Sequence, residues 1–167
     1  MRKPSRKVEL DDIIAGQILG EDPDVIALVM KIHLALEALL IEMMRAFSTD
    51  DKIYKLSFPT KTEALEKHGL IGNTDRAAFD RFNDFRNDFA HIFAHQVTLA
   101  GVLCLARDLE AQGVDFSDSV GHYSEAQASE YYGGRLGVLE EVGWCILFHA
   151  SHTLCEAGGR NIFSAPA

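Results

Sequence analysis

The sequence predicts an all-α protein, an up-and-down bundle of about five helices that forms a single domain over residues 1–167. Apolar residues recur three or four positions apart along most of the chain, and the two-residue alternation of half-buried strands is nearly absent. A length of 167 residues, with 47% hydrophobic and 25% charged residues, suits one globular domain with its own core. We expect a basic tail at residues 1–9 and a C-terminal tail at residues 158–167.

The longest apolar stripe predicts one helix over about residues 23–47. Pro23 suits the first turn of such a helix, because proline lacks an N–H that the first turn would leave unpaired. A shorter helix is expected before it, over about residues 10–20. His33 lies beside the long stripe, and we expect it to be a core residue with satisfied hydrogen bonds.

A short helix is predicted at residues 61–68. The segment Thr60-Lys61-Thr62-Glu63 has the spacing of a capping box, in which the first side chain and the fourth each bond the other's backbone. Gly69 stands where a left-handed residue would end that helix.

Phenylalanines at helical spacing predict the next helix, which follows Thr74-Asp75 and presents its aromatic face to the core: Phe79, Phe82, Phe85, Phe89 and Phe93. Aspartates four positions apart predict a solvent-facing stripe on the same helix: Asp80, Asp84 and Asp88.

The second half of the chain is also helical in pattern. Residues 97–112 are apolar on most sides, for which a subunit interface is one explanation. A last helix from about Ser124 to Glu156 is expected to be interrupted at Gly133-Gly134 and again at Gly137.

Charge and hydropathy exclude several functions. Sixteen Lys and Arg against twenty-five Asp and Glu give a net charge of −9, which argues against duplex DNA binding through a broad basic surface. No apolar run approaches the roughly 20 residues of a membrane-spanning helix, and the basic start has no apolar signal-peptide core, so we expect no membrane partner. Three cysteines without a paired spacing fit a cytoplasmic protein.

We expect the catalytic residues in the segment Arg86-Asn87-Asp88-Phe89-Ala90-His91. It resembles the signature of the HEPN superfamily, in which an Arg, usually followed by a polar residue, precedes a His by four to six positions. The resemblance extends over about residues 25–113. It implies a helical bundle that dimerises so that two motifs face one cleft, and in many members a metal-independent RNase. Other members are non-catalytic interaction or regulatory modules.

One branch of the superfamily consists of toxins silenced by partner nucleotidyltransferases, and these carry a Tyr two positions after the motif His. Here that position is Phe93, so silencing by modification of a Tyr is not expected.

RNA cleavage without a metal needs a group that moves the 2′-OH proton and a cation that holds charge on the phosphate. We assign the first task to His91 and the second to Arg86, with Asn87 one turn before His91 to orient its ring. On a straight helix Arg86 and His91 point about 140° apart. A homodimer, or a distortion near Ala90, would therefore be needed to bring them together.

We name two substrate contacts beside this set, Arg81 and His95, and expect no cofactor. A structural interpretation of the motif stays open, in which Arg86 pairs with Asp80, Asp84 or a carboxylate of a neighbouring helix and His91 packs.

A metal site is a rival. His91 and His95 are spaced to ligate one ion with Glu37 or Glu42, and His149, His152 and Cys155 form a looser cluster. Neither has a strong ligand signature, so we expect no metal.

The leading hypothesis is therefore a toxin-like or defence-related bacterial endoribonuclease that cleaves single-stranded RNA and has a cognate antitoxin or regulatory partner. The alternative is a non-catalytic HEPN-like dimer that acts through protein contacts, of the mannitol-repressor type. The net charge of −9 favours the alternative, and the intact Arg86, Asn87 and His91 set favours the nuclease.

Overall fold

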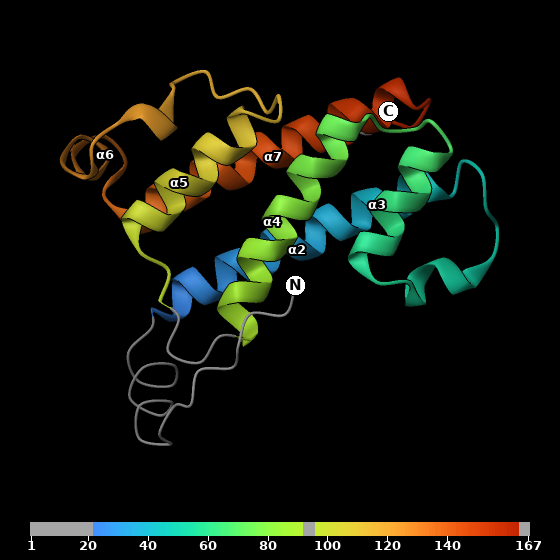
Figure 1. Cartoon of the computed structure of the whole chain (residues 1–167), viewed down its shortest axis with the longest axis horizontal. Coiled ribbons are helices and arrows are strands. Elements are labelled where there is room, and N and C mark those ends of the chain that lie inside the picture. The colour runs from blue at the N-terminus through green and yellow to red at the C-terminus, as the bar shows by residue number, and fades with distance from the viewer. Residues whose placement is uncertain (1–21, 92–95, 164–167) are drawn as a thin grey trace.

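The computed structural model describes residues 22–91 and 96–163, apart from the side chains of residues 89–91, and this part of the chain contains helices and no strand (Figure 1). The all-α prediction is confirmed. None of the described helices is both long and apolar enough to cross a membrane. The α-helices are α2 (Pro23–Met44), α3 (Phe58–Lys67), α4 (Asn73–His91), α5 (Leu99–Glu110), α6 (Glu125–Tyr132) and α7 (Arg135–Glu156), with 3₁₀ turns η2 (Asp51–Lys55) and η3 (Val120–His122).

The helices pack as a bundle around one apolar core. Helices α2 and α7 lie side by side, and contacts continue around the core from α2 to α3, α4, α5 and α7 (Figure 1). Helix α4 also packs across α2, which brings three elements, α2, α3 and α4, together. The candidate motif lies in the last turns of α4.

Helix α2 begins where the sequence predicts. Pro23 occupies its first position, and the N-cap Asp22 accepts a hydrogen bond from the backbone of Asp24 at 2.9 Å. The helix proper ends at Met44, and residues 45–47 continue as a turn. The helix expected at residues 10–20 lies outside the described residues.

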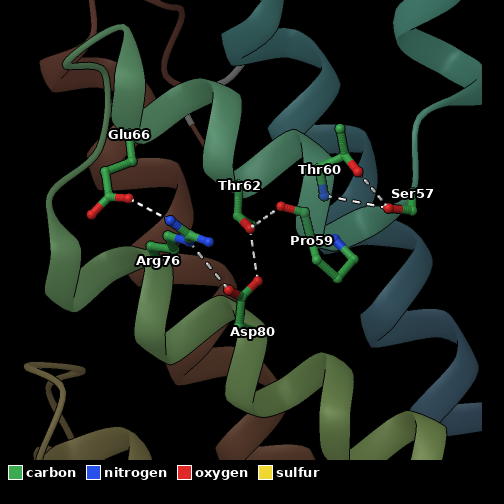
Figure 2. A network of polar contacts seen from close by, with 7 residues as sticks. All are labelled: Ser57, Pro59, Thr60, Thr62, Glu66, Arg76 and Asp80. Carbon is green, nitrogen blue, oxygen red and sulfur yellow. Dashed lines mark hydrogen bonds and ion pairs between the residues drawn. The ribbon is translucent and has the colours of Figure 1, made fainter.

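Helix α3 begins earlier than predicted. Its N-cap is Ser57, whose hydroxyl accepts from the backbone N–H of Thr60 at 3.4 Å. Thr60 is therefore inside the first turn, and the predicted capping box at Thr60–Glu63 is wrong (Figure 2). Proline is favoured at the start of a helix, and Pro59 extends this one backwards. Gly69 adopts a φ of +70°, which confirms the predicted left-handed end.

The aromatic face of α4 is core as predicted at Phe79, Phe82 and Phe85. The side chain of Phe89 and all of Phe93 lie outside the described part. Asp84 is exposed as expected, but the solvent-facing prediction is wrong for Asp80.

Asp80 is about one third exposed because α3 packs over it. Its carboxylate accepts from the hydroxyl of Thr62 at 2.7 Å and from Nε of Arg76 at 3.4 Å, and Arg76 in turn bonds Glu66 at 2.6 Å (Figure 2). Aspartate on this side of α4 thus joins it to α3.

The apolar excess of residues 97–112 is used within the chain. Five residues of α5 are buried against its own neighbours: Val102, Leu103, Leu105, Ala106 and Leu109. Helix α5 contacts α4, α7 and η3, so its composition needs no second subunit. The composition of this segment therefore gives no evidence for a subunit interface.

Gly133 and Gly134 break the last helical region as predicted, with φ of +73° and +101°. The predicted interruption at Gly137 is wrong, because α7 runs through this residue. Glycine at this position lets the backbone of Tyr132 pack directly against α7, because a Cβ on Gly137 would lie 1.8 Å from the carbonyl oxygen of Tyr132.

Candidate functional site

Arg86 is the motif residue with the most unusual surroundings. Its side chain is partly exposed, and Nη1 donates to Oδ1 of Asn87 at 3.0 Å. Its Nε is buried and has no hydrogen-bond partner. Among the described residues no carboxylate pairs with Arg86, so the expected pairing with Asp80 or Asp84 does not occur. Within residues 22–91 and 96–163 this half-buried guanidinium thus has no counter-ion.

His33 of α2 faces α4 through a buried hydrogen bond. Its Nε2 lies 3.1 Å from Oδ1 of Asn83, and both residues are buried. An amide oxygen only accepts, so this contact assigns the proton to Nε2 and leaves the lone pair on Nδ1. Nδ1 is buried without a hydrogen-bond partner. The expectation of a satisfied core histidine holds for one ring nitrogen and is wrong for the other.

Burial lowers the pKa of His33 below its usual value, against the opposing effect of the Asn83 hydrogen bond. The positive charges of Arg86 and Lys61 lower this pKa further, and the charge of Glu37 raises it. The ring of Phe58 packs on the imidazole with 5.1 Å between centroids. His33 is therefore a neutral imidazole near pH 7.

Lys61 of α3 is fully buried, and its ammonium donates to Oε1 of Glu37 at 2.5 Å and to the carbonyl of Leu56 at 2.8 Å. Glu37 lies one turn after His33 on α2, so three helices contribute to one group of polar side chains. We call it the polar cluster: His33, Glu37, Lys61, Asn83 and Arg86. Since Glu37 and Lys61 neutralise each other, Arg86 gives the cluster a net positive charge within a chain of net charge −9.

The structure describes the side chains of only two members of the predicted catalytic set, Arg86 and Asn87. His91 is the last residue of α4, and its side chain lies outside the described part, as does His95. Helix α4 is unbroken through Ala90, so the distortion considered there is absent. Oδ1 of Asn87 is engaged by Arg86, which makes Asn87 a support for the guanidinium.

Arg81, proposed as a substrate contact, ties α4 to α5. Its Nε donates to Oδ2 of Asp108 at 2.8 Å, and about a third of its side chain is exposed. A substrate phosphate would have to compete with Asp108 for this guanidinium.

The side chains proposed for a metal site have other partners. Glu37 binds Lys61 and Glu42 binds Arg160 at 3.3 Å, while His149 lies 2.8 Å from Asp75. Within the described residues no group of three or more His, Cys, Asp or Glu side chains is arranged to hold a metal ion.

Sequence reasoning missed two features. The first is the polar cluster, although Asn83 had a signal as a polar residue four positions after Phe79, on the aromatic face of the predicted helix. The second is an aromatic patch of Trp144, Phe148 and Phe163, whose rings pack with centroids 4.4–6.4 Å apart. Trp144 is 54% exposed and Phe148 51% exposed, which is high for rings of this size.

No family model, no curated protein and no solved structure matches this chain.

Proposed function

We propose that this protein is a metal-independent endoribonuclease of the HEPN type that cleaves single-stranded RNA. One observation carries the proposal: Arg86 holds a partly buried positive charge with no carboxylate partner among the described residues and with its Nε unpartnered. A charge removed from water without a counter-ion costs free energy, and a bound anion removes that cost. A phosphodiester is the anion that an RNA substrate supplies, and guanidinium groups bind phosphate well.

In the proposed reaction His91 takes the proton of the ribose 2′-OH or protonates the leaving 5′ oxygen. Arg86 stabilises the charge that builds up on the attacked phosphate, and Asn87 holds the guanidinium in place. The 2′ oxygen forms a bond to phosphorus as the bond to the 5′ oxygen breaks, so the product ends in a 2′,3′-cyclic phosphate.

The proposal includes a homodimer. Positions 86 and 91 lie about 140° apart on a regular helix, and α4 is helical from Asn73 to His91, so we expect the two residues to act together only across two chains. A two-fold axis near the end of α4 would place Arg86 beside His91 of the partner subunit. Light scattering at micromolar concentration should then report about twice 18.5 kDa. A clean monomer would contradict the composite site.

The test is cleavage of single-stranded RNA by the wild type and by Arg86→Ala and His91→Ala. Both variants should lose activity. Arg160→Ala and His152→Ala are the matched controls, since these side chains are 73% and 74% exposed and form surface ion pairs with Glu42 and Glu156. Circular dichroism and size should be unchanged in all four variants. Cleavage by Arg86→Ala and His91→Ala at the wild-type rate would contradict the proposal.

The aromatic patch favours a second candidate, a non-catalytic module that acts through protein contacts. Exposed Trp and Phe side chains that pack together are typical of interaction surfaces. This candidate predicts that RNA is left intact. It also predicts that Trp144→Ala dissociates the dimer, so that light scattering reports a lower mass than for the wild type. A toxin-like or defence role in a cytoplasm, and a neutralising partner, belong to the first candidate and share its test.

A further inference from the structure

Two side-chain nitrogens are buried without a hydrogen-bond partner in the part of the chain that the structure describes, Nδ1 of His33 and Nε of Arg86. They belong to the same cluster. Asn83 bonds His33 and lies three residues before Arg86 on α4, so Asn83 and Arg86 share a helix face. Buried polar atoms are nearly always paired in folded proteins. Both unpartnered atoms lie next to Asn83, His33 through its hydrogen bond and Arg86 through helix spacing, and Arg86 acts electrostatically on His33.

The chemistry of the two atoms identifies the ligand class. Nε of Arg86 carries a hydrogen and can only donate. Nδ1 of neutral His33 can only accept, but it becomes a second donor when the ring takes up a proton. Two N–H donors and two positive charges match an oxyanion such as a phosphate or sulfate group.

The charges around His33 explain why protonation would follow the anion. From α2 it is faced by Glu37, from α3 by Lys61 and from α4 by Arg86. Glu37 and Lys61 form an ion pair, so Arg86 supplies the uncompensated charge that opposes a proton on the imidazole. An anion on Arg86 would offset that charge, while burial, the largest cause of the lowered His33 pKa, would still act. Arg86 is partly exposed, whereas His33 is buried, so an anion would meet the guanidinium of Arg86 first.

We propose that His33, Asn83 and Arg86 form an oxyanion-binding site in which His33 takes up one proton from solvent as the anion binds and releases it when the anion leaves. Asn83 accepts from Nε2 in both states and holds the ring. His33 is a positioning residue, and no covalent bond changes. The inference rests on the proposed function for the identity of the natural oxyanion, which would be the RNA phosphodiester.

The first experiment uses the wild-type protein and sulfate, because the charge of sulfate is constant between about pH 5 and pH 8. The carbon-bound imidazole protons are followed by NMR through this range, in sulfate and in chloride of equal ionic strength, with His33→Gln to assign the His33 signal. Sulfate should raise the titration midpoint of His33. A His33 midpoint that is the same in both salts would overturn the proposal, whatever any variant does.

The second experiment measures sulfate affinity at two pH values. If one proton is taken up with the anion, the wild type should bind sulfate about tenfold tighter for each unit by which the pH is lowered. This holds between the His33 midpoint in sulfate and the His33 midpoint in chloride. His33→Gln should bind sulfate with little pH dependence. Arg86→Gln should lose sulfate binding and, by removing a positive charge, raise the midpoint of His33 in chloride. Equal pH dependence in His33→Gln and the wild type would contradict the role of His33.

These outcomes separate the inference from the nuclease proposal. A sulfate-dependent His33 midpoint in a protein that leaves RNA intact supports the oxyanion site and contradicts the nuclease. If the protein cleaves RNA and its His33 midpoint is the same in sulfate and in chloride, the nuclease proposal is supported and the oxyanion site is contradicted.

Discussion

The buried ammonium of Lys61 lies 2.5 Å from the carboxylate of Glu37, across the contact between α3 and α2. Lys61 has no exposed side-chain surface, whereas Glu37 keeps about a quarter of its own. The pair therefore fixes α3 against α2 without adding net charge to the polar cluster. Arg86 therefore determines the sign of the net charge of the polar cluster.

We predict that the two halves of this pair are unequal in their effect on stability. Glu37→Gln leaves a buried ammonium without its counter-ion and should lower the free energy of unfolding by about 3 kcal/mol. Lys61→Met keeps the volume and leaves a partly solvated carboxylate, so it should cost clearly less. Urea unfolding at pH 7 measures both. A larger loss in Lys61→Met would show that packing and the bond to Leu56, not charge, dominate.

The state of His33 predicts how stability depends on pH. Because burial lowers its pKa in the folded chain, the unfolded chain binds the proton more readily. Its contribution to stability is fully present above the usual value of 6.5 and is lost as the pH falls from there through the lower folded pKa. Unfolding free energies of the wild type and His33→Gln from pH 7.5 to pH 5 should converge as the pH falls. Parallel curves would contradict the neutral buried imidazole.

For Asp80 we predict a pH dependence of stability that is opposite in sign to that of His33. Burial raises its pKa above the usual 3.8, although the Thr62 hydrogen bond and the Arg76 charge oppose the shift. The folded chain therefore holds this proton more tightly, and the contribution is present below pH 3.8 and lost as the pH rises through the folded pKa. The stability of the wild type relative to Asp80→Asn should fall as the pH rises over this range.

Thr62→Val removes a hydroxyl that donates to Asp80 and should raise the pKa of Asp80 further. It should also cost about 1–3 kcal/mol, because a partly buried acceptor loses its donor. Carboxyl titration by NMR, with thermal unfolding, checks both effects. An unchanged or lower pKa in this variant would exclude Thr62 as a partner of the charged carboxylate.

Gly137→Ala should destabilise the corner between α6 and α7 by about 2 kcal/mol, because its Cβ would collide with the backbone carbonyl of Tyr132. Gly143→Ala is the comparison. There the nearest atom is Cδ1 at the end of the Ile32 side chain, 2.4 Å away, and a side-chain end yields more easily than backbone. Thermal unfolding should therefore rank Gly137→Ala as the less stable. The reverse order would contradict this reading of the corner.

The sequence predicts the fold better than the site. Periodicity finds the buried faces because burial follows spacing, as at Phe79 and Phe82. Periodicity fails at Asp80. A charged residue outside the apolar stripe is expected to face solvent, and the spacing along α4 does not reveal that α3 packs over this carboxylate. His33 and Asn83 are 50 positions apart, and no local pattern reports a hydrogen bond between helices that tertiary packing brings together. Arg86 can be picked out as a motif residue, but only the three-dimensional structure reveals that no carboxylate of the described residues pairs with it.

The most direct test of the account is the chemistry of the cleavage product. Single-stranded RNA is incubated with the wild-type protein in EDTA, beside a DNA of the same sequence, and the fragments are weighed by mass spectrometry. Since attack by the ribose 2′-OH needs no activated water in the first step, we predict RNA fragments that end in a 2′,3′-cyclic phosphate and intact DNA. RNA left intact, or cleavage that requires a divalent metal or also cuts the DNA, would contradict the central claim.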